Sequence, residues 1–150
     1  MSVKIVVKTS GSLSAIVDEY PEKIKAQMEG RAYRGANELR NASLQILRGQ
    51  GGGRRYRIPG TKGYYTASAP GSPPAVRTGA FRLSWQPSAN ASGNSYVSKI
   101  ESNLHTDNGG YVLGELLEGG TSKMAPRPHH DKIKEQAMPE IARIYEEPYF

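Results

Sequence analysis

Two adjacent histidines and an aspartate, His129-His130-Asp131, are the residues of this 150-residue chain whose types first suggest chemistry. Imidazole and carboxylate groups bind zinc when three or four of them converge on one point. Adjacent side chains of a regular element point in different directions, however, and the remaining histidine, His105, is distant in sequence. We therefore predict no metal site. We interpret the segment as the polar start of a helix, where Asp131 is favourable near the positive end of the helix dipole.

Two glutamates, Glu115 and Glu118, could be written as a carboxylate pair for acid–base catalysis. Nothing in the neighbouring sequence would orient them or raise a pKa, and Glu118 is followed by Gly119-Gly120. We interpret both as solvated or interfacial carboxylates. An enzyme acting through Glu115, Glu118 or His129 is the least favoured hypothesis for this chain.

Other patterns that carry catalysis or bind cofactors are missing from the sequence. It has no cysteine, which excludes disulfides, thiol nucleophiles and thiolate metal ligands. It has no Gly-x-Ser-x-Gly nucleophile motif and no dinucleotide-binding fingerprint. The glycine-rich segment from Gly49 to Gly53 lacks the Lys-Ser/Thr pair that would hold a phosphate and Mg²⁺. We expect neither enzyme activity nor a cofactor.

The elements that position these groups begin with a strand and a long helix. Val3–Lys8 alternates weakly and is rich in β-branched residues, which favours a strand. A short helix is expected over Ser12–Glu19, with the serine as its cap. Apolar residues recur at steps of three and four over Pro21–Arg48, which predicts a longer helix that Gly49 terminates. Its alanine-rich middle, with Gly35, permits close approach by a sheet or another helix.

The second half of the chain is expected to add a β-hairpin and a short helix. Alternating apolar residues predict a half-buried strand over Thr78–Trp85 and a second strand over Tyr96–Leu104. A turn is expected between them at Pro87–Gly93, and another at Asp107–Gly110. Tyr111–Leu117 is compatible with a strand or a short helix, and its leucines favour the helix.

The stretch Leu116–Pro128 separates two apolar-patterned segments. Gly119-Gly120 ends the preceding element, and two prolines impose a short extended crossing before a last helix that begins near Pro128 and reaches about residue 147. Pro139 is expected to kink that helix or split it in two. The sequence thus predicts a single α+β domain over residues 1–150. In it, a long N-terminal helix and a C-terminal helix pack on a small antiparallel sheet, and a long loop extends from the domain.

The composition fits a compact domain with large polar excursions. Apolar residues make up 37% of the chain, and the mean hydropathy is −0.60. No apolar run approaches the ~18 residues that a membrane span needs. The first eight residues are too short and too alternating for a signal peptide. We expect a protein that is assembled in a cytoplasm and makes no contact with a membrane.

The net charge of +6 is distributed unevenly. No aspartate or glutamate occurs between Leu39 and Ile100, and nine basic residues give this middle region a charge of +9. The two ends together carry −3. Such asymmetry indicates a surface that meets a polyanion or an acidic partner, or one copy of the chain meeting another.

A basic arm, defined as residues 50–76, is the most unusual part of the chain. It is rich in glycine and proline, and a structureless loop of this length is uncommon inside a compact domain. Its cationic and aromatic residues interleave: Arg54, Arg55, Tyr56, Arg57, Tyr64 and Tyr65. Two interpretations remain open, namely a flexible surface loop and an arm that orders on binding a neighbouring subunit or nucleic acid.

Four segments in this order resemble the tail-completion or head–tail joining proteins of long-tailed bacteriophages, a family of small neck and minor tail proteins. The segments are Ala69-Pro70-Gly71-Ser72-Pro73-Pro74, Thr78-Gly79-Ala80-Phe81-Arg82-Leu83-Ser84, Leu117-Glu118-Gly119-Gly120-Thr121 and Met124-Ala125-Pro126-Arg127-Pro128. The resemblance spans about Ala69 to the C-terminus and, more loosely, the long first helix. One departure is His129-His130, where the family usually has an aromatic or apolar residue.

The resemblance implies a structural role in a virion, at the junction of the DNA-filled head and the tail. It implies a homo-oligomeric ring, often a hexamer, whose partners are other neck and tail proteins: a connector or stopper, and a tail terminator or tube. Nonspecific contact with genomic DNA would fit the basic middle. The expected interface residues are Arg54, Arg55, Tyr56, Arg57, Tyr64, Tyr65, Arg77, Arg82, Glu118, Gly119, Thr121, Met124, Pro126, Arg127 and Pro128.

A second hypothesis comes from a different class of protein. Arginines interleaved with tyrosines are the composition that single-stranded nucleic acid sites use, so the arm could serve a nucleic-acid-binding accessory protein. The sequence contains no recognisable nucleic-acid-binding motif, and a charge of +9 over 62 residues is moderate. Nonspecific phosphate contact is compatible with it, and specific readout is not supported.

Overall fold

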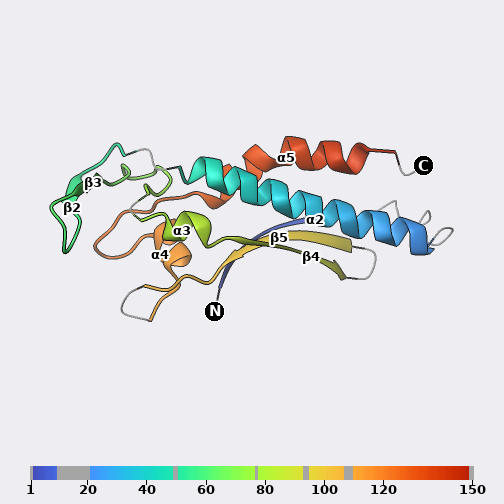
Figure 1. Ribbon diagram of the computed structural model, residues 1–150, viewed down its shortest axis with the longest axis horizontal. Coiled ribbons are helices and arrows are strands. Elements are labelled where there is room, and N and C mark those ends of the chain that lie inside the picture. Colours follow the sequence, from blue (N-terminus) through green and yellow to red (C-terminus); the bar gives the residue numbers. More distant parts are fainter. Residues whose placement is uncertain are drawn as a thin grey trace.

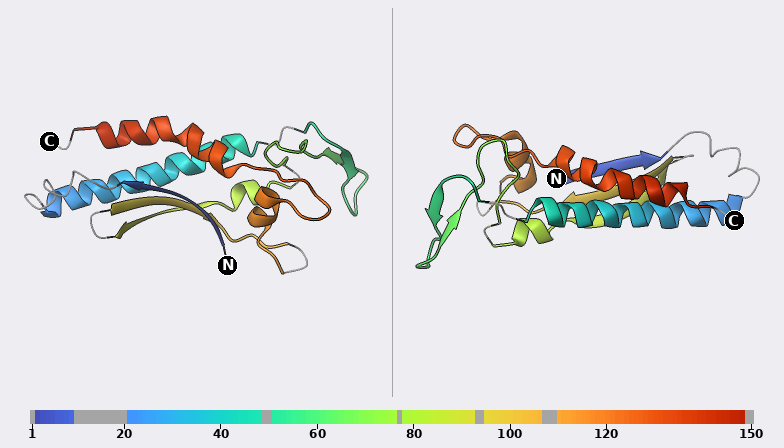
Figure 2. Two further views of the ribbon diagram at one scale, coloured as in Figure 1. Left: turned by 180° about the vertical axis from the view of Figure 1, so that it is seen from behind. Right: turned by 90° about the horizontal axis from the view of Figure 1, so that it is seen from above.

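The computed structural model describes residues 2–9, 21–48, 51–76, 78–92, 95–106 and 110–148. The helix expected over residues 12–19, the terminating Gly49 and all but the last residue of the turn expected at 107–110 lie outside this set. Two long helices, α2 (Pro21–Ile46) and α5 (His130–Glu146), lie side by side over one face of a three-stranded antiparallel sheet (Figures 1 and 2). A two-stranded hairpin projects from one end. This architecture confirms the predicted α+β class.

The sheet has strand order β1-β5-β4, so the last strand in sequence is the central one. Strand β1 (Val3–Thr9) and strand β4 (Gln86–Ser92) flank β5 (Ser95–Ser102). The register of β1 on β5 runs from Val3 opposite Ser102 to Thr9 opposite Tyr96. Burial alternates strictly along β5, with Tyr96, Ser98, Ile100 and Ser102 facing the helices. The strands predicted over 3–8 and 96–104 are therefore confirmed.

The prediction for residues 78–93 was wrong, because strand and turn are exchanged there. The segment expected as a strand contains the short helix α3 (Ala80–Leu83), and the segment expected as a turn is β4. Gly79 has φ of 85°, a left-handed conformation that starts α3 and that a strand does not contain. Pro87 is tolerated in β4 because that strand lies at the edge of the sheet, where a missing N–H need not cost a ladder hydrogen bond.

Helix α2 approaches the sheet closely, as its thin middle predicted. Its inward positions recur at helical spacing and are buried: Ile24, Met28, Ala32, Ala36 and Leu39. The hydroxyl of Ser98 in β5 donates a hydrogen bond to the carbonyl of Ala32 at 2.6 Å. A Cβ on Gly35 would lie 2.7 Å from that hydroxyl oxygen, so only glycine leaves room for this contact.

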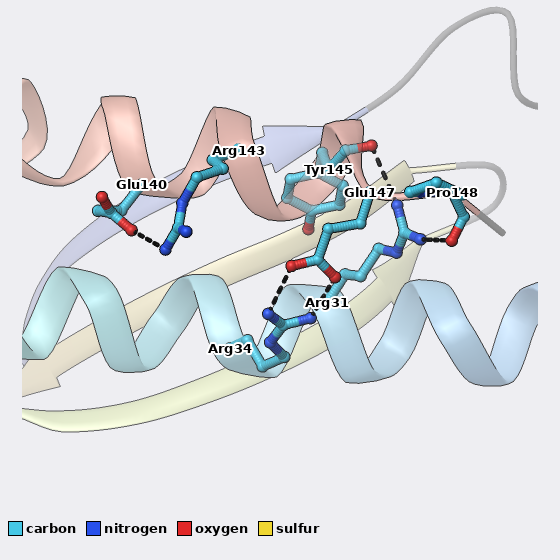
Figure 3. A network of polar contacts seen from close by, with 7 residues as sticks. All are labelled: Arg31, Arg34, Glu140, Arg143, Tyr145, Glu147 and Pro148. Atoms are coloured by element: carbon cyan, nitrogen blue, oxygen red, sulfur yellow. Dashed lines mark hydrogen bonds and ion pairs between the residues drawn. The ribbon is translucent and has the colours of Figure 1, made fainter.

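Helix α5 packs along α2 through its buried residues Ile133, Ala137, Ile141 and Ile144. Pro139 lies inside it on the exposed side, and the helix continues through as one element, so the alternative of two separate helices was wrong. Pro128 precedes the capping residue His129 rather than occupying the first turn. Two arginines of α2 reach across to the end of α5 (Figure 3). Arg31 donates to the backbone, and Arg34 forms a bidentate ion pair with Glu147 at 2.7 Å.

The remaining elements gather at the end of the sheet from which the hairpin projects (Figure 1). Helix α4 (Leu113–Gly119) confirms the helical alternative for its segment. The basic arm carries the hairpin of β2 (Arg55–Arg57) and β3 (Tyr64–Thr66), so the long loop expected there contains a small two-stranded sheet. Within the described residues, no helix is both long enough and apolar enough to span a membrane.

Candidate functional site

A cavity of about 660 Å³ lies between the hairpin and the body of the domain. Residues from all four segments that carry the family resemblance line it, although these segments are spread over some sixty positions of the sequence. Five of the expected interface residues are among the lining: Tyr56, Tyr65, Arg82, Met124 and Arg127. The apolar part of the wall includes Phe81, Leu113 and Leu117.

The stretch after α4 forms one wall of the cavity by folding back on itself. Gly120 has φ of 76° and donates its N–H to the carbonyl of Leu116 at 2.8 Å, which ends α4. The N–H of Thr121 then bonds the carbonyl of Met124 at 2.8 Å, and the N–H of Arg127 bonds the carbonyl of Leu117 at 2.7 Å. These backbone contacts hold residues 120–128, called the strip below, in a defined shape without regular secondary structure.

The proline-glycine loop of the arm is joined to the same strip. The N–H of Gly71, which has φ of 82°, donates to the carbonyl of Pro126 at 3.0 Å. Two segments that are 55 residues apart are thus connected by their backbones. The sequence indicated each segment separately and gave no sign that they touch.

The hairpin combines cations and aromatic rings as the sequence suggested. The Tyr56 and Tyr65 rings stack with centroids 5.8 Å apart. The guanidinium of Arg54 lies 5.4 Å from the centre of the Tyr56 ring, and that of Arg55 lies 4.5 Å from the centre of Tyr64. These contacts within the hairpin stabilise its shape. Apart from half-buried Tyr65, these residues remain exposed and accessible to a partner.

Arg82 has a structural role that the sequence did not indicate. Its Nε–H donates to the carbonyl of Leu44, in the last turn of α2, at 2.8 Å. Arg40 donates in a similar way to the carbonyl of Trp85 at 3.1 Å. Two of the basic residues of the middle region therefore hold α3 and the segment after it against α2. The Nε–H donors of these two arginines are therefore used within the fold and are not available to a phosphate.

Glu118 is not a freely solvated carboxylate, which corrects that part of the expectation, whereas its role at an interface stays a prediction. Its Oε2 accepts hydrogen bonds from the backbone N–H of His129 at 2.8 Å and of His130 at 3.2 Å. The carboxylate thereby caps the N-terminus of α5 from the end of α4, where the helix dipole favours negative charge. Glu115 is exposed, as expected. No local motif connects Glu118 with a helix that starts twelve residues later, so only the tertiary structure reveals the cap.

The two histidines pack against each other in the interior instead of diverging. Their rings meet edge to face with centroids 4.6 Å apart, and His129 is fully buried against Phe81 and Trp85. His129 is the capping residue, with φ of −144°, so the geometry that separates neighbouring side chains within a helix does not apply to it. The expectation of a polar helix start was therefore wrong for His129.

Burial sets the protonation state of this pair. It lowers the pKa of His129, against a smaller raising effect of the carbonyl of Arg127, and it lowers the pKa of His130, against the attraction of Glu118. The Nδ1 of His129 lies 2.9 Å from that carbonyl oxygen and 3.0 Å from Oε2 of Glu118. The carbonyl oxygen can only accept, so Nδ1 carries the proton. The Nε2 atoms of both histidines and the Nε1 of Trp85 are buried and have no hydrogen-bond partner among the described residues.

The other expected interface residues lie around this centre. Arg54, Arg55, Arg57 and Tyr64 are on the exposed hairpin, Gly119 is exposed at the end of α4, and Thr121 and Pro126 are exposed on the strip. Pro128 is half-buried next to the histidines. Arg77 lies outside the described residues.

Comparisons with known proteins identify no relative of this chain. No protein-family model matches the chain, and neither the curated proteins nor the solved structures contain a match.

Proposed function

We propose that this chain is a structural protein of a long-tailed bacteriophage virion, of the neck or tail-completion type. It would form a ring, often of six copies in the family it resembles, at the junction of the DNA-filled head and the tail. Its partners would be a connector or stopper on one side and a tail terminator or tube on the other. It would be assembled in the host cytoplasm and would not act as an enzyme.

One observation carries this proposal: the four segments that resemble the family meet at a single cavity. If the four segments together form one binding surface, the function of that surface explains why all four resemble the family. Four loops lying apart from one another would have no such common explanation. The exposed hairpin beside the cavity offers rigid aromatic rings and arginines, which are enriched at protein interfaces. A surface of this kind suits a heterologous contact, which closes into a ring when its rotation closes.

The test is a phage that lacks this protein. Filled heads and tails should accumulate separately, and supplying the wild-type chain should restore joined, infectious particles. A chain with Met124→Glu, which places a charge in the cavity wall, should fold but fail to restore joining. Lys132→Glu, at an exposed position on α5, is the matched control and should restore it. Joined, infectious particles without the protein would refute the proposal.

The exposed arginines of the hairpin favour one alternative function, nonspecific binding of nucleic acid. Arg54, Arg55 and Arg57 are exposed, and the hairpin that carries them projects from the domain (Figure 1), where a phosphate backbone could reach it. If each contacts one phosphate, replacing all three by alanine should reduce the slope of log K against log salt by about 2 to 3. Absence of DNA and RNA binding by the wild-type chain at low salt would exclude this function.

A further inference from the structure

A cluster of three potential metal ligands lies where α4 ends and α5 begins. Glu118, His129 and His130 each place one ligand atom within 4.8 Å of the other two. The cap that Glu118 forms on α5 holds this arrangement, since its carboxylate bonds the backbone of both histidines. Three ligands from two rigid elements therefore converge in a partly buried pocket of the fold.

We propose that Glu118, His129 and His130 bind a divalent transition-metal ion of the zinc class, with solvent completing the coordination. Two imidazoles and one carboxylate are a ligand set that zinc uses when one position is left to water. Imidazole nitrogen also selects against Mg²⁺ and Ca²⁺, which prefer oxygen ligands. The site is independent of ring assembly, because all three ligands belong to one chain.

The hydrogen bonding of His129 prepares it as a ligand. Its Nδ1–H donates to the carbonyl of Arg127, and this is the kind of outer contact that fixes the tautomer and orientation of metal-binding histidines. The neutral ring that results has its free electron pair on Nε2. That atom is buried without a partner, as is Nε2 of His130. A buried Nε2 acceptor on His129 without a donor is costly to leave, and a cation satisfies it.

Binding requires a small rearrangement of the cluster. Ligand atoms around zinc, with bonds of about 2.1 Å, lie roughly 3.4 Å apart in a tetrahedral site. Oε2 of Glu118 now lies 3.0 Å from Nδ1 of His129, which carries the proton, so the carboxylate must move toward Nε2 before it can share an ion with both rings. Glu118 has room for this movement, because its side chain is 29% exposed. The same exposure gives an ion a path from solvent.

A buried water molecule is the competing occupant. The Nε1–H of Trp85 also has no partner and stands close to both histidines, so a water could donate to the two rings and accept from the indole. A water requires no metal and predicts no uptake. The two occupants are therefore distinguished by measuring metal binding directly.

The experiment uses the full chain without a histidine tag, freed of metal by chelator and titrated with Zn²⁺ and Co²⁺. We expect one equivalent to bind, with a rise in the unfolding temperature that chelator reverses. Glu118→Gln and His130→Gln should each weaken binding about tenfold or more. His105→Gln, which changes an exposed histidine, is the matched control and should bind like the wild type.

X-ray absorption at the zinc edge of the wild-type protein gives a second readout that needs no variant. It should show two imidazoles and oxygen ligands. The proposal is overturned if the wild-type chain takes up no metal in a saturable way. It is equally overturned if Glu118→Gln and His130→Gln bind as tightly as the wild type, or if the bound ion has no imidazole ligand.

Discussion

The guanidinium of Arg31 donates a hydrogen bond to the carbonyl oxygen of Tyr145 at 3.0 Å, from the middle of α2 to the last turn of α5. A second bond, also 3.0 Å, reaches the carbonyl of Pro148. Arg31 is 5% exposed, so its charge is satisfied mainly inside the protein. The side chain closes the end of one helix from the surface of its neighbour and fixes how the two lie together (Figure 3).

Replacing Arg31 by alanine should therefore destabilise the fold strongly. Loss of the two charge-assisted hydrogen bonds of this buried guanidinium, together with its packing, predicts about 2 to 4 kcal/mol less free energy of unfolding. The matched control is Arg143→Ala, which removes a 75% exposed guanidinium from a surface pair with Glu140. That change should stay within about 0.5 kcal/mol. Urea denaturation of both variants measures the difference, and equal losses would contradict the role assigned to Arg31.

The carboxylate of Glu147 should titrate below its usual range. Hydrogen bonds from the guanidinium of Arg34 lower the pKa of Glu147 from the ordinary value of 4.5. A lowered folded-state pKa means that this pair stabilises the protein above pH 4.5 and that its contribution is lost as the pH falls through the lower value. Carboxyl NMR should show the midpoint return toward 4.5 in Arg34→Ala. Lys132→Ala, at the opposite end of α5, should leave it unchanged.

Two adjacent glycines should respond differently to the same substitution. Gly120 has φ of 76°, and an added Cβ would lie 2.8 Å from the nitrogen of Pro126, so Gly120→Ala should cost about 2 kcal/mol or more. Gly119 lies in the last turn of α4 with open space around it. Gly119→Ala should be neutral or stabilise by up to about 1 kcal/mol. Thermal unfolding compares the two, and equal effects would refute the shape assigned to the strip.

A second glycine pair tests the contact between α2 and the sheet. An added Cβ at Gly35 would meet the Ser98 hydroxyl at 2.7 Å, so Gly35→Ala should cost about 1 to 3 kcal/mol. The double variant with Ser98→Ala should recover much of that loss, because the clashing oxygen is gone. Gly30→Ala, where an added Cβ meets nothing within 4 Å, should stabilise by up to about 1 kcal/mol. If the double variant recovers nothing, a cause other than this contact would be required.

The helices and the central strand could be predicted because their patterns are local. Apolar residues of α2 and α5 recur at helical spacing, and β5 alternates strictly, so the buried face of each follows from the sequence. The segment around Gly79 could not be assigned in this way. Phe81, Leu83 and Trp85 alternate as in a strand, but only Trp85 is fully buried, and Leu83 is 57% exposed. The left-handed conformation of Gly79 starts the short helix α3 in this segment, although the alternating pattern predicts a strand.

The candidate site was predicted only in part for a related reason. The individual segments around the cavity carried recognisable residues, whereas the contact between Gly71 and Pro126 depends on the path of the whole chain. The histidine cluster was missed because its third member, Glu118, is eleven positions from His129 and belongs to another helix. Sequence spacing describes neighbours on one element and says nothing about groups that two elements bring together.

Contacts between the first and last parts of the chain also affect when the protein can fold during its synthesis. Strand β1 pairs with β5, so Val3 cannot form its pairing until Ser102 has been synthesised. Arg31 likewise cannot bond the carbonyl of Pro148 until that residue has been added to the chain. Pairings this distant in sequence slow folding, because the intervening chain loses conformational entropy before the contacts that stabilise the fold can form. Until α5 has been synthesised, α2 exposes the apolar face that α5 covers in the folded protein. Such a nascent chain is a natural client for a chaperone, and translation pauses in the last third of the message should lower the yield of folded protein.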